Sequence, residues 1–210
     1  MSTLLSCSAL VGMLGLLLGA TPVPMAAQQQ TEADEYTRYV LLAPETGKFQ
    51  ISYEVSATTP GARYFFNPIR KGSEASDEAV FDRMTGAPLR FEVVDGATAR
   101  AGGLPSADLE TQYIRIELPR SVPREGEVRI LIDKTYRDPK SYYLDGADLV
   151  FTRSLGIKRN AVVLPDGYEL IGCNVPSQVL TDDRGRTFLS FINAGPDAAS
   201  LVVRARRLAR

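Results

Sequence analysis

The chain has 210 residues, of which 44% are hydrophobic and 23% are charged, and its formal net charge is −1. This balance is typical of a soluble globular protein and differs from that of disordered or membrane-embedded chains. The near-zero charge disfavours nucleic acid as a partner, because nucleic-acid binders usually carry a basic excess that neutralises phosphates.

The N-terminal segment, residues 1–27, carries no charged side chain and contains an apolar run from Ala9 to Ala20. Two prolines follow, then the small residues Ala26 and Ala27, then a polar stretch. This order is that of a secretory signal peptide. We therefore expect a bacterial protein that is exported, periplasmic or secreted, with no membrane span once the signal is removed.

The alternative is an uncleaved N-terminal anchor helix. The uncharged run from Leu4 to Ala20 is short for a span of about 20 apolar residues.

Removal of the signal also takes Cys7 and leaves Cys173, so no internal disulfide can form. Cys173 lies in an apolar, strand-like run, and we expect it to be a buried free thiol.

After the signal segment, no helical periodicity persists over eleven residues. Short apolar–polar alternations recur instead, separated by Gly, Pro, Asp and Asn. Their spacing of roughly 8–12 residues is typical of a β-sandwich or barrel. In chain order the predicted strands are residues 49–55, 64–69, 79–82, 89–93, 113–118, 128–133, 141–144, 149–152, 161–164, 168–171, 177–180, 187–191 and 201–205.

Turn residues indicate which of these strands pair. Gly86 predicts a hairpin between 79–82 and 89–93, and a Pro/Gly connection predicts one between 113–118 and 128–133. Pro68 restricts its strand to an edge or a bulge. Residues 95–108 are predicted to be a loop. Further turns at Asp145-Gly146, Pro165-Asp166-Gly167 and 182–185 join 141–144 to 149–152, 161–164 to 168–171, and 177–180 to 187–191.

The pattern predicts an all-β fold, with one or two packed antiparallel β-sandwich units after the N-terminal signal segment. The best internal boundary is the stretch Asp138-Pro139-Lys140. It would separate a first sandwich unit, 36–137, from a second β unit, 138–208, packed on the first.

The absence of histidine excludes most catalytic sites. Ser-His-Asp and Cys-His catalysis, HExxH peptidase sites and imidazole zinc sites all need it. One mature cysteine cannot build a thiolate zinc or iron–sulfur site, and no phosphate-binding or dinucleotide-binding glycine motif occurs. We therefore predict no metal, no cofactor and no enzymatic activity, with carboxylate-only catalysis left open.

The acidic residues favour turns, where an Asp side chain caps neighbouring backbone N–H groups. A calcium site at Asp145 and Asp148, or an acid pair for a glycan hydrolase or lyase, is the alternative. The acids concerned are Asp133, Asp138, Asp145, Asp148, Asp166, Asp182 and Asp183.

The most distinctive segment, residues 133–143 followed by 153–160, concentrates tyrosines beside basic residues. Such side chains could form a platform for a sugar or an acidic peptide, through stacking and charge-assisted hydrogen bonds. Alternatively, the tyrosines pack into the core, or the same residues seal the two halves against each other. The candidate ligand-binding residues are Tyr136, Tyr142, Tyr143, Arg153, Lys158 and Arg159.

Two passages, residues 51–82 and 138–179, resemble segments of exported bacterial proteins of unassigned function. In its general sequence pattern, the stretch 45–205 is also similar to the non-catalytic β-rich N-terminal domains of M1-type aminopeptidases. The resemblance implies a β-sandwich accessory module. It implies no peptidase activity, because this sequence has no histidine and no zinc-bearing catalytic segment.

Together these features predict an exported, non-enzymatic binding or scaffold module. Its partner would be an envelope protein, a peptide or a glycan. Two alternatives remain at this point: a carboxylate-based glycan hydrolase or lyase, and a self-associating structural subunit of the envelope.

Overall fold

The computed structural model describes residues 35–209, and the predicted signal segment lies outside this range. No helix within the range is long and apolar enough to cross a membrane. The elements are β1 (Tyr36–Leu41), η2 (Pro44–Thr46), β2 (Lys48–Ala57), β3 (Tyr64–Pro68), β4 (Glu74–Asp82), β5 (Phe91–Val94), α1 (Gly96–Ala101), β6 (Tyr113–Glu117), β7 (Val128–Arg137), β8 (Tyr142–Asp145), β9 (Asp148–Leu155), β10 (Arg159–Val163), β11 (Tyr168–Cys173), β12 (Gln178–Thr181), β13 (Thr187–Ile192) and β14 (Ala199–Arg207).

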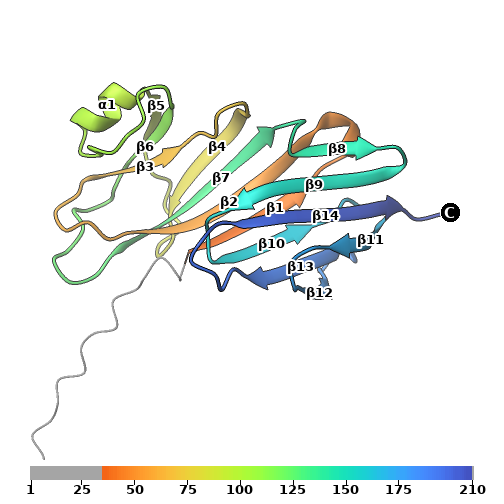
Figure 1. The fold of residues 1–210 in the computed structure, drawn as a ribbon. Helices are drawn as coiled ribbons and strands as arrows, with labels where there is room; N and C mark the ends of the chain where they lie inside the picture. The colour runs from red at the N-terminus through yellow and green to blue at the C-terminus, as the bar shows by residue number, and fades with distance from the viewer. Residues whose placement is uncertain (1–34, 210) are drawn as a thin grey trace, which may run out of the picture.

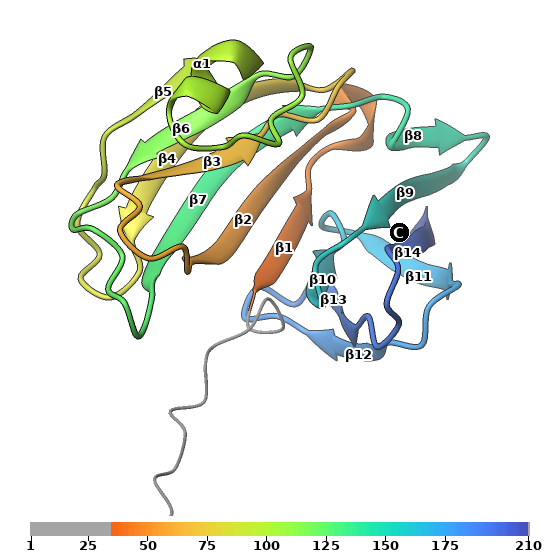
Figure 2. The same ribbon diagram turned by 60° about the vertical axis from the view of Figure 1, so that its left-hand side comes forward.

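The strands within residues 35–209 form three sheets. The largest has seven strands in the order β12-β13-β10-β1-β2-β7-β4, and the smaller ones run β11-β14-β9-β8 and β3-β6-β5. Figures 1 and 2 show the three-stranded sheet with α1 at one end of the molecule and the four-stranded sheet at the other. The all-β, sandwich-like class predicted from the sequence is confirmed.

Both small sheets pack on the same face of the seven-stranded sheet, as the alternation of β2 shows. Phe49 and Ile51 contribute to one buried cluster, whereas Val55 and Ala57 contribute to another. All four side chains lie on one face of the strand, because residues two apart point the same way. Tyr53, on that face between them, contacts both clusters.

Under the four-stranded sheet lies a cluster rich in rings, here called the aromatic cluster. Phe49 is at its centre, with ring centroids 5.3 Å from Phe151, 6.2 Å from Tyr136 and 6.4 Å from Tyr142, all edge-on. Such edge-to-face pairs add about 0.5–1.5 kcal/mol each to ordinary burial. The aromatic cluster includes Tyr39, Leu41, Phe49, Ile51, Tyr136, Tyr142, Phe151, Val162, Leu189, Phe191 and Leu201.

Under the three-stranded sheet the core has branched aliphatic side chains instead, and we call it the aliphatic cluster. Burying each such side chain contributes roughly 1.5–3 kcal/mol. It consists of Val55, Ala57, Val80, Ile114, Ile116, Leu118, Val122, Val128, Ile130 and Ile132.

Turn chemistry predicted two hairpins correctly. β8 pairs with β9 around Asp145-Gly146, and β12 pairs with β13 across residues 182–185. Pro68 ends β3, which is an edge strand of the three-stranded sheet, as expected. These features depend on a few adjacent residues, so the local sequence was sufficient to predict them.

Other predicted pairings are wrong, because the strands concerned lie in different sheets. β6 and β7 do not pair; Ile114 and Ile116 face Ile130 and Ile132 across the aliphatic cluster. The turn at Gly86 forms, with the bridge Phe81↔Pro88, but β5 then joins β6 rather than β4. Likewise β10 and β11 lie in facing sheets.

Three elements were not predicted from the sequence: β1, α1 and the 3₁₀ turn η2. β1 lies in the middle of the large sheet and pairs in parallel with β10, from Tyr36↔Arg159 to Val40↔Val163. α1 lies within the expected loop 95–108 and is capped by Asp95, whose carboxylate accepts from the Thr98 N–H at 2.8 Å.

The two small sheets come from opposite sides of the boundary predicted at Asp138, whereas the large sheet takes strands from both sides. Every strand of the three-stranded sheet precedes residue 138, and every strand of the four-stranded sheet follows it. The seven-stranded sheet takes strands from both sides, since β1, β2, β4 and β7 pair in one sheet with β10, β12 and β13.

Candidate functional site

A buried arginine lies at the centre of the predicted binding segment. The Arg153 guanidinium lies over the rings of Phe49, Tyr136 and Tyr39, at 5.3, 5.5 and 5.6 Å from their centroids. Its Nη1 is 3.5 Å from Oδ2 of Asp138, and both side chains are only 7% exposed. Burial lowers the pKa of Arg153, but the guanidinium remains charged at any physiological pH.

Asp138, held by the Arg153 charge, accepts hydrogen bonds that stabilise the turn after β7. Its carboxylate accepts from Ser141 Oγ at 2.7 Å, from Ser73 Oγ at 3.2 Å, and from the backbone N–H of Lys140. Burial alone would raise the pKa of Asp138, but the hydrogen bonds from Ser141 and Ser73 and the Arg153 charge outweigh it and hold the pKa below its usual value. The turn therefore has a fixed shape.

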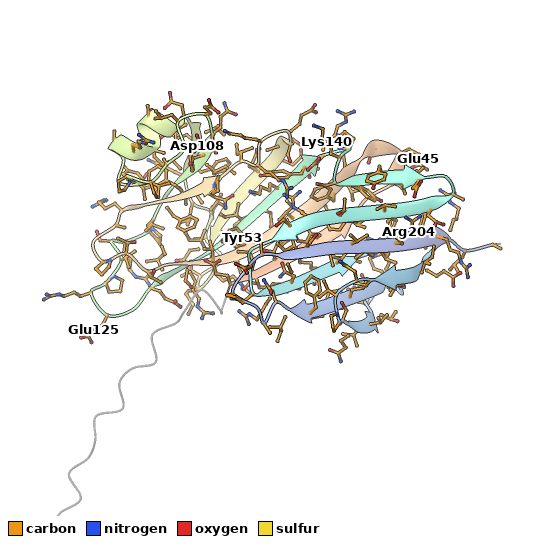
Figure 3. The ribbon with its side chains drawn as sticks, in the orientation of Figure 1. Glu45, Tyr53, Asp108, Glu125, Lys140 and Arg204 are labelled. Carbon is orange, nitrogen blue, oxygen red and sulfur yellow. The ribbon has the colours of Figure 1, made fainter. Side chains whose placement is uncertain are left out.

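Beside this turn is a shallow hollow of about 270 Å³, here called the end groove. One wall is the 3₁₀ turn η2, and the other is Pro139 with β8. Figure 3 shows Glu45 and Lys140 at the end of the molecule where β8 lies. The end groove is lined by Pro44, Glu45, Thr46, Gly47, Arg137, Pro139, Tyr142, Tyr143 and Leu144.

The two walls are tied together through Tyr142 and Gly47. Tyr142 is buried in the aromatic cluster, and its hydroxyl donates to the Leu42 carbonyl at 2.6 Å. Gly47 ends η2 with φ of +59°, a left-handed conformation that costs other residues about 1–2 kcal/mol. The neighbouring Tyr143 and Leu144 remain exposed, so β8 anchors one wall and offers apolar surface to the groove.

Opposite charges lie at the rim of the end groove. Arg137 Nη1 is 3.2 Å from Glu74, and Glu45 is 3.5 Å from Arg207. Exposed ion pairs of this kind contribute about 0–1 kcal/mol. Both charges can therefore exchange their present partners for groups on a ligand at little cost.

The six predicted binding residues do not form one exposed platform, which corrects that interpretation. Tyr136, Tyr142 and Arg153 are buried between the seven-stranded and four-stranded sheets, and both tyrosines belong to the aromatic cluster. Lys158 is half-buried, its Nζ donating to the Gly195 carbonyl at 2.5 Å. Arg159 lies at the surface, with Nε donating to the Glu35 carbonyl at 3.4 Å.

Of the six, Tyr142 and Tyr143 line the end groove, and four residues of the opposite wall, Pro44 to Gly47, escaped the sequence argument. The Pro-Glu-Thr-Gly stretch could have been recognised as a turn. Its position beside β8 could not, because roughly a hundred residues separate them and no local pattern links them.

The acidic residues are mostly engaged by arginine. Arg204 Nη2 is 3.0 Å from both Asp145 and Asp148, so a guanidinium occupies the place proposed for calcium. Among residues 35–209 no group of three or more His, Cys, Asp or Glu side chains could hold a metal ion. The described carboxyl groups with a clearly shifted pKa, Asp95, Asp108, Asp138 and Asp182, are all shifted downward, opposite to what a general acid needs.

Cys173 is half-buried rather than fully buried, which corrects the prediction. It lies at the end of β11, the outermost strand of its sheet, where the core covers only one side. Its side chain packs against the aromatic cluster, and Sγ is 3.5 Å from Ser177 Oγ.

Comparison with known proteins finds similarity in fold only. No family model matches the sequence, and no curated protein matches it. Among solved structures, the M1 zinc metallopeptidase of Deinococcus radiodurans aligns over 82% of this chain with a TM-score of 0.50 and 10% identity. A mutant of that enzyme bound to a Tyr-Ser-Ala substrate gives 0.50 and 11%.

The chain spans 41% of the length of those metallopeptidases. An aminopeptidase N family protein from Idiomarina loihiensis is also similar, with a TM-score of 0.46, 10% identity, and coverage of 81% of this chain and 29% of that one. At these identities the likeness concerns the fold alone. The predicted resemblance to the β-rich part of M1-type aminopeptidases is thereby confirmed at the level of fold.

Proposed function

We propose that this chain is an exported, non-catalytic module that binds a peptide segment of a partner protein in the end groove. The observation that carries the proposal is the groove itself, where the exposed side chains of Tyr143 and Leu144 adjoin two prolines and two opposite charges. Partly hydrophobic hollows with a few polar groups are the usual form of binding sites.

The size of the groove limits what it can hold. Its volume of about 270 Å³ is below the roughly 300–1,000 Å³ of pockets that enclose a drug-sized ligand. It therefore suits one or two side chains of a larger, extended ligand. A peptide with an apolar or aromatic side chain fits Tyr143 and Leu144, and flanking charges of either sign could pair with Glu45 or Arg137.

The buried ion pair supports this proposal by making the groove rigid. Arg153 fixes Asp138, Asp138 fixes the turn through Ser141, and the turn carries Pro139. A wall held in place by the core needs little ordering when a ligand binds, and pre-organisation of this kind favours affinity.

The test is selection of peptides from a random displayed library on the purified chain, followed by binding measurements with Tyr143→Ala. We expect the variant to bind selected peptides at least tenfold more weakly. Tyr64→Ala is the matched control, because Tyr64 is 39% exposed and Tyr143 is 38% exposed, but Tyr64 lies on β3, outside the groove. Equal binding by both variants, or no selected peptide, would refute the proposal.

A glycan array screened in parallel separates the two ligand classes. Glycan binding that needs Tyr143, without peptide binding, would replace peptide by sugar as the ligand. Export has its own test, since it depends on residues 1–27 and not on the groove. N-terminal sequencing of the protein recovered from the periplasm or medium should show a chain starting after Ala27.

A further inference from the structure

We infer that the free edge of β12 is a self-association surface, on which a second copy of this chain adds its own β12 in antiparallel register. β12 is the outermost strand of the seven-stranded sheet, and all four of its residues are exposed. Figure 1 shows it with β11 and β13 at the end of the molecule away from α1. This surface is separate from the end groove.

Within residues 35–209, no backbone hydrogen bond is made to the outer side of β12. The Asp182 N–H donates to the Arg186 carbonyl at 2.9 Å, toward β13. Because backbone groups alternate in an antiparallel pair, Leu180 and Gln178 also bond toward β13. The N–H and C=O groups of Val179 and Thr181 therefore point outward, where another strand can accept and donate.

The other edge strands of the described sheets carry charged side chains, prolines or bulges that block such pairing, whereas β12 is protected only by its short length of four residues. Charged side chains, prolines and bulges are the usual protection of a sheet edge. In this protein the blocking features are Pro68 on β3, Glu74 and the bulge between Ser76 and Ala79 on β4, Glu92 on β5, Asp145 on β8, and Glu169 and the bulge between Leu170 and Gly172 on β11. The sequence of β12, Gln-Val-Leu-Thr, has no charge, no proline and no bulge.

The lack of charge favours a second copy as the partner. A two-fold pairing brings the same surface of both molecules together, so a charged edge would oppose its own like charge. Here Val179 can lie opposite Val179 of the second copy, with Gln178 opposite Leu180 of that copy. The nearest carboxylate, Asp182, is turned inward, 2.8 Å from Arg186, and its side chain is only 7% exposed.

The size of the contact implies a weak dimer. A four-residue edge buries less than the roughly 1,200 Å² of a stable interface. We therefore expect dimerisation at about 10–100 μM rather than at nanomolar concentration.

Sedimentation velocity of the full chain, purified with its N-terminus as the cell leaves it, tests the inference from about 1 to 200 μM. We expect the wild type to shift toward the dimer and Val179→Lys to remain monomeric, because two lysines would then face each other. Val93→Lys is the matched control: Val93 is 48% exposed on the edge strand β5, and Val179 is 54% exposed on β12. It should dimerise as the wild type does.

Amide hydrogen exchange locates the contact. The Val179 and Thr181 amides should become at least tenfold more protected as the concentration of wild type rises, while those of β5 should not change. A wild type that is monomeric at 200 μM, a dimer that persists in Val179→Lys, or protection elsewhere would each overturn the inference. Tyr143→Ala should leave dimerisation unchanged, so failure of one proposal does not decide the other.

Discussion

The aromatic and aliphatic clusters lie on the same sheet face, yet they differ in what they contain. The aliphatic cluster is built of Val, Ile, Leu and Ala side chains. The aromatic cluster surrounds a buried ion pair, Arg153 with Asp138, and adjoins the end groove. The buried arginine–aspartate pair therefore lies in the half of the molecule that also carries the end groove, whereas the other half has an aliphatic core.

The largest effect should come from removing the centre of each cluster. Phe49→Ala should lower the free energy of unfolding by about 3–5 kcal/mol, and Ile130→Ala by about 2–5 kcal/mol. We expect the greater loss for Phe49, because its ring also makes edge-on contacts with three others. Urea unfolding measures both. A larger loss for Ile130 would show that the aliphatic half governs stability.

The next largest effect on stability should come from breaking the buried ion pair, and its size should depend on whether Asp138 or Arg153 is replaced. Asp138→Ala leaves the Arg153 charge buried without its partner, which should cost about 3–5 kcal/mol. Arg153→Met should cost less, because hydrogen bonds from Ser73, Lys140 and Ser141 still stabilise the Asp138 carboxylate and Met fills the space of the Arg153 side chain. Thermal melts of both variants, with peptide binding alongside, decide whether the pair serves stability or only the shape of the groove.

The free energy of unfolding should depend on pH through Lys134, which lies between the aromatic and aliphatic clusters. Lys134 lies on β7 between Ile132 and Tyr136, its Nζ 2.5 Å from Asn67 Oδ1, and burial lowers its pKa to about 8. Between pH 8 and its ordinary value of 10.5, the unfolded chain holds this proton and the folded chain does not. Stability should therefore rise with pH in this window, by up to about 3 kcal/mol.

The measurement is the urea midpoint from pH 7 to 9.5, with Lys134→Met as the control that should show no such rise. The upper limit avoids the tyrosines, because burial raises the pKa of Tyr39, Tyr136 and Tyr142. Above pH 10 the unfolded tyrosines lose their protons first, so stability should fall there. A flat wild-type profile up to pH 9.5 would contradict the lowered pKa of Lys134.

The smallest expected effect on stability comes from replacing a turn glycine, and it can be compared between the end groove and a turn outside it. Gly47→Ala and Gly86→Ala both place a side chain at positive φ, +59° and +73°, and each should cost roughly 1–2 kcal/mol. Only Gly47 belongs to the end groove, so only Gly47→Ala should also weaken peptide binding. Equal binding by the two variants would mean that the shape of η2 is unimportant for the ligand.

Sequence patterns predicted what depends on neighbouring residues. Asp145-Gly146 placed one hairpin, and the alternation from Phe49 to Val55 placed the central part of β2. They could not assign strands to sheets: Ile114 and Ile130 alternate in the same way whether their strands pair side by side or face each other across a core. That choice depends on contacts between distant segments.

The candidate site was predicted only in part for the same reason. Tyr142 and Tyr143 were both predicted to be binding residues, but which one is buried depends on the sheet above them. Arg153 was expected near the surface as a cation, whereas the rings of Phe49 and Tyr136 hold it in the core. Nothing in the local sequence distinguishes an arginine that meets solvent from one that meets rings.

The parallel pairing of β1 with β10 has a consequence for the order of folding. Tyr36 pairs with Arg159, so the centre of the large sheet closes only after more than a hundred further residues have been synthesised. Contacts of such long sequence separation slow folding, because the intervening loop must close first. An early, complete fold on the ribosome is therefore disfavoured, and a chain that stays open longer is easier to pass through a membrane, in keeping with the proposed export.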